Sequence, residues 1–163
     1  MTTLIETLAD VPRGSPLGEA LQARAEILRL SEAAHDAVLV PRDPGGLSHA
    51  LRAALAARMC RHVGNDDLAK HYDGYLAHLG DLDVAPLAQP DGFSGDPLID
   101  AMARHADLLT VAPRKATRAD IAALKGAGLG EADIVRLAEL AAFVNYQLRV
   151  IAGLKLLKGV DVP

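Results

Sequence analysis

The stretch from Glu131 to about Leu157 constrains the fold most, because it carries two apolar stripes at helical spacing instead of one. The first stripe consists of Ile134, Leu137, Ala141, Val144, Leu148 and Ile151. The second consists of Leu140, Phe143, Val150, Leu154 and Leu157. A helix that is buried on one side needs only one apolar stripe, so this helix is expected to lie between two packing partners.

One partner of this helix is the core of its own chain. We expect the other to be a second subunit, which makes the protein a homo-oligomer, most simply a dimer, because an uncovered second stripe is an apolar patch that soluble monomers rarely expose. The alternative is that the N-terminal helix, from Leu17 to Leu30, folds back over the second stripe within one chain.

The rest of the sequence also predicts helices, and no period-two pattern of a strand persists. Prolines and glycines mark loops at residues 41–46 and 80–95. The expected helices cover residues 1–10, Ser15-Pro16 to His35 or Leu39, Leu47–Val63, Asn65–Leu79, Asp96–Leu109 and Thr117–Lys125. The apolar residues are mainly Ala, Leu and Val, which suits closely packed helices. We predict an all-α bundle of about six to seven helices in one domain over residues 1–163, with residues 1–40 as an N-terminal extension.

Composition narrows the classes of function. The net charge is −4 and there is no basic cluster, so nucleic acid is not an expected partner. A single cysteine, Cys60, excludes an internal disulfide and suits a cytoplasmic compartment. The N-terminus lacks the features of a signal peptide. No apolar run approaches the roughly 18 residues of a membrane span, so no membrane is expected.

Several motifs occur in the order of a known family. Residues 127–135 form a Gly-Leu turn with acidic residues that opens a helix, and residues 143–149 contain an aromatic–x–Asn–aromatic–x–x–Arg pattern. Residues 109–124, with a proline before a short Ala-rich helix, and Gly46-Leu47-Ser48 add to the pattern. Over about residues 43–157 the chain resembles the carboxymuconolactone decarboxylase / AhpD-like alkylhydroperoxidase superfamily. The resemblance implies an AhpD-like helical bundle, usually oligomeric, whose family role is antioxidant defence.

The redox site of that family is a Cys-x-x-Cys-x-x-x-His segment at the start of a helix. The helix N-terminus favours the thiolate, and the second cysteine resolves the sulfenic acid formed on the first. In this chain the Gly64 turn matches, but Asn65 and Leu68 stand at the two cysteine positions. Tyr72 stands at the histidine position, with His71 one place earlier. We therefore expect a catalytically altered or inactive homo-oligomer with a residual small-molecule pocket, and no cofactor or metal.

Cys60 has two interpretations. It could be the nucleophile of a one-cysteine peroxidase, with His62 as base. However, residues two apart on a helix do not face each other, and Cys60 lies near a helix C-terminus, where the dipole disfavours a thiolate. We favour a buried, poorly reactive thiol on a small-residue face.

His71 is the main candidate for acid/base chemistry, with Tyr72 nearby, as resemblance to lactone decarboxylases allows. It shares a predicted helix face with Asp67, Tyr75 and His78. Asp67 could orient the imidazole, although a solvated face explains the same pattern.

Asn145 and Arg149 lie four residues apart on the last helix. They suit a structural anchor, in which a buried arginine must be paired, or an anion-binding pocket. The candidate pocket residues are Asn65, Asp67, Leu68, Asn145 and Arg149. His35, His49 and His105 have no evident partner in the sequence and are expected at the surface.

Overall fold

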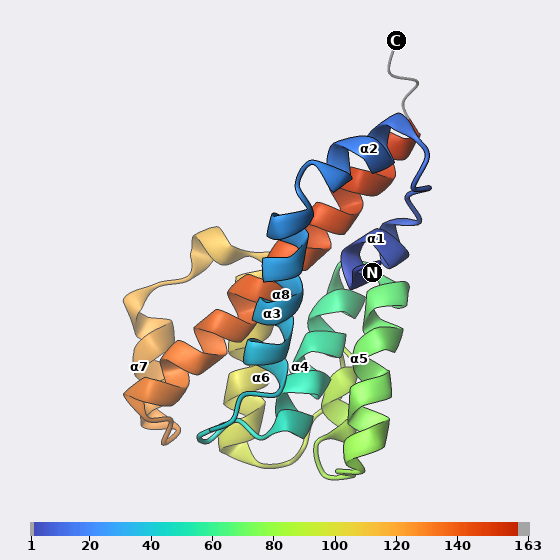
Figure 1. Ribbon diagram of the computed structural model, residues 1–163. Helices are drawn as coiled ribbons and strands as arrows, with labels where there is room; N and C mark the ends of the chain where they lie inside the picture. Colours follow the sequence, from blue (N-terminus) through green and yellow to red (C-terminus); the bar gives the residue numbers. More distant parts are fainter. Residues whose placement is uncertain (1, 160–163) are drawn as a thin grey trace.

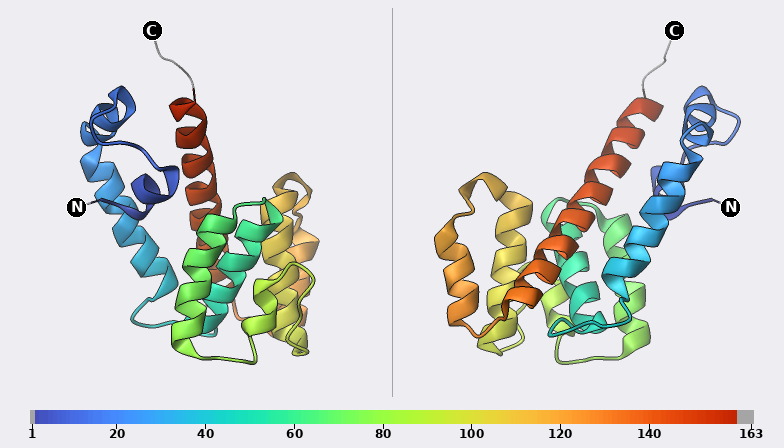
Figure 2. Two further views of the ribbon diagram at one scale, coloured as in Figure 1. Left: turned by 90° about the vertical axis from the view of Figure 1, so that its right-hand side faces the viewer. Right: turned by 60° about the vertical axis from the view of Figure 1, so that its left-hand side comes forward.

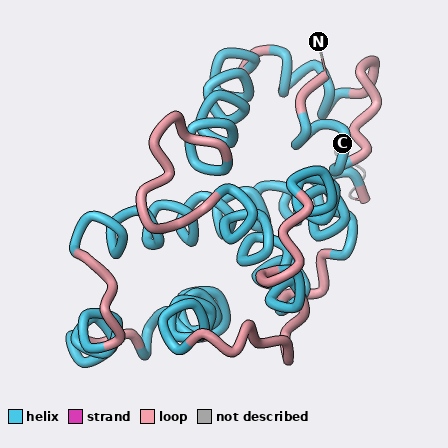
Figure 3. Tube along the Cα trace, turned by 90° about the horizontal axis from the view of Figure 1, so that it is seen from below, coloured by secondary structure: helices cyan, strands magenta, loops and turns pink. Residues whose placement is uncertain are grey.

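The computed structural model describes residues 2–159, and within this range Figure 3 shows only helices and loops. The α-helices are α1 (Leu4–Ala9), α2 (Pro16–Gln22), α3 (Ala25–Leu39), α4 (His49–His62), α5 (Asp66–Leu79), α6 (Pro97–Val111), α7 (Arg118–Gly126) and α8 (Glu131–Lys158). Two short 3-10 helices, η1 (Ala85–Ala88) and η2 (Pro113–Lys115), lie in the loops that flank α6. The all-α prediction is confirmed, with eight α-helices in the described range instead of six to seven.

One extra helix arises because the predicted N-terminal helix is divided in two. The pattern predicts a continuous helix from Pro16 to His35 or Leu39, whereas Arg24 leaves the helical conformation (φ −116°, ψ 21°) and separates α2 from α3. No glycine or proline stands at this break, so local propensity does not reveal it. Packing accounts for the position of α3, because the Ser31 hydroxyl lies 2.8 Å from the Tyr146 hydroxyl of α8.

Helix α4 is the centre of the molecule. Every residue from Ala50 to Cys60 is buried, including Arg52 and Arg58. Leucines lie along one stripe of this helix and alanines along another, and α5, α6, α8 and η1 all contact it. Alanine side chains are short, so these helices can approach α4 closely from several directions.

Helix α8 crosses the whole molecule, and its C-terminal half extends beside the N-terminal helices (Figures 1 and 2). Helices α1 and α3 pack on it, and within this single chain Leu140 and Leu154 of the second stripe are already buried. Leu157 is 50% exposed. The N-terminal segment therefore covers much of the second stripe through α1 and α3, and α3 includes only the last part, residues 25–30, of the predicted Leu17–Leu30 helix.

By length and composition alone, α8 is also the one helix in residues 2–159 that could cross a membrane. In the structure 44% of its most apolar stretch is buried against other helices. The core helix of a soluble domain meets the same criterion, so this observation is weak evidence for a membrane.

Candidate functional site

The turn between α4 and α5 is the position at which the resemblance places a redox site. Gly64 adopts a left-handed conformation (φ 71°), which a residue with a side chain rarely adopts. Asn65 follows as the N-cap of α5, and its side-chain oxygen accepts a hydrogen bond from the Leu68 amide at 3.1 Å. The backbone N–H of Asn65 in turn donates to the backbone carbonyl of Cys60 at 2.9 Å. These contacts fix Asn65 at the surface end of α5.

A small pocket opens beside Asn65. Its volume is about 260 Å³, and its lining comes from the α4–α5 turn, the end of α6 and the middle of α8. The lining residues are Val63, Asn65, Thr110, Asn145, Leu148, Arg149 and Ala152. Three of the five predicted pocket residues, Asn65, Asn145 and Arg149, thus meet at one place, although they lie far apart in the sequence.

The other two predicted pocket residues lie elsewhere. Leu68 is fully buried and belongs to the hydrophobic core, because it lies on the face of α5 that meets α4. Asp67 points to the opposite side, where its carboxylate lies 3.4 Å from the Lys155 amino group at the surface. Neither residue lines the Asn65 pocket; Asp67 instead lines a separate pocket of about 590 Å³ with Lys155 and Lys158.

Asn145 and Arg149 differ in exposure. Asn145 is 9% exposed, and its amide nitrogen donates to the Ala141 carbonyl at 2.9 Å. Arg149 is exposed, contrary to the expected buried anchor, because it stands on the side of α8 that no helix in residues 2–159 covers. One of its terminal nitrogens donates to the Asn145 carbonyl at 3.0 Å, which holds the guanidinium at the pocket rim.

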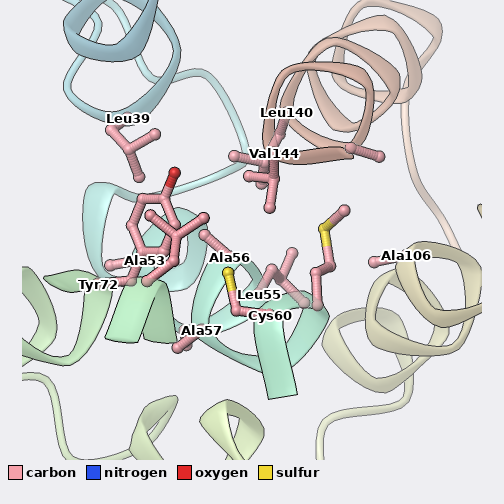
Figure 4. Packing of buried hydrophobic residues seen from close by; sticks show 14 of the residues in the cluster. Leu39, Ala53, Leu55, Ala56, Ala57, Cys60, Tyr72, Ala106, Leu140 and Val144 are labelled. Carbon is pink, nitrogen blue, oxygen red and sulfur yellow. The ribbon is translucent and has the colours of Figure 1, made fainter. Parts of the chain in front are cut away.

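Cys60 lies in the core and not in the pocket. It is fully buried, and Figure 4 shows its sulfur within the cluster that also holds Tyr72, Leu140 and Val144. Burial raises the pKa of the Cys60 thiol, so the thiolate that a peroxidase needs is disfavoured. His62 lies 2.8 Å from the Asp107 carboxylate, although the geometry is not that of a hydrogen bond. His62 is therefore placed beside Asp107 and not as a base for Cys60.

His71 lies against a second histidine. Its Nε2 atom is 3.0 Å from Nε2 of His35, and the Nδ1 atom of His35 is 3.0 Å from the Asp36 carboxylate. If Nδ1 of His35 donates to Asp36, its Nε2 must accept, and His71 is the donor. Burial first, and then the charge of His35, lower the pKa of His71 to about 4. The partner of His71 is therefore His35 and not the predicted Asp67.

Aromatic rings surround the histidine pair. The His71 ring lies 5.2 Å from the Tyr72 ring and 5.3 Å from the Tyr75 ring. The Tyr72 hydroxyl donates a hydrogen bond to the side-chain oxygen of Gln147 on α8. Tyr72 is fully buried, and burial raises its pKa well above the ordinary value. It therefore contributes a buried hydrogen bond and is held as a neutral phenol.

Three histidines expected at the surface are partnered or buried. His35 is 4% exposed and His105 is 8% exposed, because α3 packs on α8 and brings His35 against His71 of α5, and α6 packs on α7. His49 has a ring nitrogen 2.9 Å from the Pro41 carbonyl. The sequence could not identify the neighbouring element, so the expected exposure is wrong for His35 and His105, whereas His49 is partly exposed.

Arg58 is the important buried residue that the sequence interpretation missed. It is 2% exposed, and it forms a two-point ion pair with Asp107, at 2.7 and 2.8 Å. It also donates to the carbonyls of Gln89, Pro90 and Gly92 at 2.6–2.8 Å. The loop expected over residues 80–95 is therefore fixed to α4. A charged residue in the middle of an Ala/Leu helix was the available signal.

Within residues 2–159, no three His, Cys, Asp or Glu side chains gather in a way that could hold a metal ion. The His35–His71 pair supplies only two nitrogen ligands, whereas structural and catalytic zinc sites use at least three protein ligands. The Asn65 pocket offers amide, hydroxyl and guanidinium groups, which recognise polar organic ligands.

Comparisons with known proteins support the fold. No protein-family model matches the sequence, and no curated protein matches it. Among solved structures, an uncharacterized peroxidase-related protein from Silicibacter sp. TM1040 is similar, with a TM-score of 0.68 and 20% sequence identity. The match covers 88% of this chain and 87% of that one. At this identity the likeness concerns the fold, so the chain shares the helical architecture of a peroxidase-related protein.

Proposed function

We propose that this protein is a divergent AhpD-like, carboxymuconolactone decarboxylase-type scaffold that binds a small molecule and has lost dithiol peroxidase chemistry. The observation that carries the proposal is the start of α5. Asn65 occupies the first cysteine position as a helix cap, while a pocket of about 260 Å³ remains beside it. A binding space thus lies beside the position of the first missing thiol.

The absence of a dithiol cycle follows from the thiol content. An intramolecular cycle needs a peroxidatic and a resolving cysteine, and the chain has only Cys60. Cys60 is fully buried, and its pKa is raised. A peroxide would have to reach the core, and the thiol would have to ionise there, before any reaction began.

A peroxide-consumption assay tests this part of the proposal. Wild type and Cys60→Ser are each mixed with an alkyl hydroperoxide and a dithiol reductant. We expect both proteins to consume peroxide no faster than buffer with reductant. Consumption by the wild type that Cys60→Ser abolishes would establish the one-cysteine alternative. Consumption that survives in Cys60→Ser would refute the loss of peroxidase activity altogether.

A second candidate is a cofactor-independent acid/base enzyme that uses His71. The hydrogen-bonded series Asp36–His35–His71 favours it, because it leaves Nδ1 of His71 as the acceptor nitrogen of a neutral imidazole. Against it, the lining of the Asn65 pocket does not include His71. An NMR titration separates the two: a pocket ligand that shifts the His71 ring signals as strongly as the Asn65 amide would favour catalysis by His71.

We also propose self-association through the exposed side of α8. Within one chain, Leu156 is 71% exposed and Leu157 is 50% exposed. Ile27 and Leu30 of α3 are about half exposed, within one turn of Ser31, which contacts Tyr146 of α8. Both helices thus present exposed apolar side chains, and symmetric pairing of two copies would remove them from water.

Sedimentation at micromolar concentration tests the oligomer. The wild type should exceed the mass of one 17.1 kDa chain. Ile27→Glu and Leu156→Glu should shift the mass toward one chain without unfolding, because both side chains already face solvent in the single chain. Leu82→Glu is the control, since Leu82 is 83% exposed on a loop away from α8. A monomeric wild type would end this proposal.

A further inference from the structure

The structure assigns the Asn65 pocket to a small hydroxy carboxylate, that is, an organic acid of a few carbon atoms with a hydroxyl group beside the carboxylate. This inference rests on the proposed function, since it names the ligand class of the same pocket. The volume of about 260 Å³ lies just below the range of sites for drug-sized ligands, so a small metabolite fits.

The carboxylate would be held by two donors. Arg149 uses one terminal nitrogen for the Asn145 carbonyl, and its Nε and second terminal nitrogen form no hydrogen bond with the described residues. A planar guanidinium with free N–H groups recognises a carboxylate at two points. Asn65 uses its side-chain oxygen to cap α5, so its amide nitrogen remains available as the second donor.

The hydroxyl would be recognised by Asn145. The amide nitrogen of Asn145 donates to the Ala141 carbonyl at 2.9 Å and lies 3.5 Å from the Thr110 hydroxyl. Because Thr110 donates its own proton to the Ala106 carbonyl, it can only accept from Asn145. The orientation of the Asn145 amide is therefore fixed, and its side-chain oxygen accepts no hydrogen bond from residues 2–159.

The side-chain oxygen of Asn145 is a second argument for a ligand, separate from the position of Asn65 at the N-terminus of α5. Asn145 is 9% exposed, lines the pocket, and holds a carbonyl oxygen that lacks a donor among residues 2–159. Solvent reaches this oxygen through the pocket, so a ligand with a donor group can take the place of solvent as its hydrogen-bond partner. Among residues 2–159, no carboxylate lines the pocket to balance an ammonium group. A neutral hydroxyl therefore suits this position better than the amine of an amino acid.

Two acids moderate the affinity. Asp66 and Asp67 lie in the first turn of α5 and offset the positive end of its dipole. Neither lines the pocket. The positive charge that faces a ligand is then mainly that of Arg149, and binding of a small acid is expected in the millimolar range.

An NMR titration of the ¹⁵N-labelled protein tests the assignment, with lactate of each hand, propionate and alanine as probes. At least one lactate should shift the side-chain amides of Asn65 and Asn145, and should bind more tightly than propionate or alanine. Arg149→Met should weaken lactate binding by about tenfold or more. Asn65→Ser keeps a capping oxygen but removes the amide donor, so it should weaken binding without unfolding α5.

Arg118→Met is the matched control, because Arg118 is an exposed arginine on α7 outside the pocket, and it should leave binding unchanged. Equal binding of propionate and lactate would overturn the role of Asn145, and tighter binding of alanine would overturn the choice of hydroxyl over amine. If non-acidic fragments shift the same amides while no carboxylate does, the ligand class is wrong but the proposed binding function survives. The peroxide assay remains the separate test of lost redox chemistry.

Discussion

Replacing His71 with Gln should reduce the loss of stability that this protein undergoes as the pH falls from 6.5 to about 4. Burial, and next the charge of His35, lower the pKa of His71 from 6.5 to about 4 in the folded state. The folded pKa thus lies below the unfolded one. As the pH falls below 6.5, the unfolded chain takes up a proton that the folded protein does not, so folding loses free energy. The loss is complete near the folded pKa.

The magnitude follows from the size of the pKa shift and the exposure of the ring. One pKa unit corresponds to about 1.4 kcal/mol, so the full shift sets an upper bound of about 3 kcal/mol. His71 is only half-buried, and solvent screens part of this cost. We expect a contribution of about 1–2 kcal/mol to the acid-induced loss of stability. Gln at position 71 cannot ionise, but its amide nitrogen can still donate to Nε2 of His35.

Urea unfolding at several pH values between about 7.5 and about 4 measures this contribution. Other groups titrate in the same range, so the informative quantity is the difference in unfolding free energy between His71→Gln and wild type. This difference should move in favour of the variant as the pH falls. His78→Gln is the control, because His78 is exposed on the same helix. A difference that does not change with pH, or that moves in favour of the wild type in acid, would refute the reasoning.

Two further predictions concern side chains on α4. A thiol reagent should label Cys60 in the native protein far more slowly than in urea, because the sulfur is fully buried and its pKa is raised; labelling at the unfolded rate would disprove the buried state. Arg58→Met should lower the unfolding free energy by about 3–5 kcal/mol, since it leaves Asp107 and several loop carbonyls without their buried partner. Adding Asp107→Asn to this variant should restore part of that loss, and a loss below about 1 kcal/mol in urea unfolding would contradict the role of Arg58.

The candidate pocket shows what a resemblance can contribute to a site prediction. Asn65, Asn145 and Arg149 were named because they fall on motif positions, and the fold brings them to one pocket. Leu68 was named because it stands at the second cysteine position, and Asp67 because it shares a helix face with His71. On a helix, successive residues point about 100° apart, so neighbours in sequence face different surroundings. Leu68 consequently enters the core, and Asp67 faces the solvent.

Thr110 and the histidine pair could not be predicted in this way. Thr110 lines the pocket because α6 packs against α8. In the sequence, a threonine within a helix gives no indication of such a position. His35 and His71 are 36 residues apart. In the sequence, His35 has no evident partner, and Asp67 is the candidate partner of His71. The position of α3 against α5 and α8 depends on the break at Arg24, which the local sequence does not mark.

The sequence by itself determined the helices, most of their ends and the absence of a dithiol, because these depend on local or countable properties. Side-chain caps at Asn65 and Thr117 start helices through contacts within three residues. Only the tertiary structure decided which helix faces meet. It placed α1 and α3 on the second stripe of α8, paired His35 with His71, and enclosed Arg58. Periodicity shows that a face is apolar or polar, but the packing of the whole chain selects the neighbour that covers it.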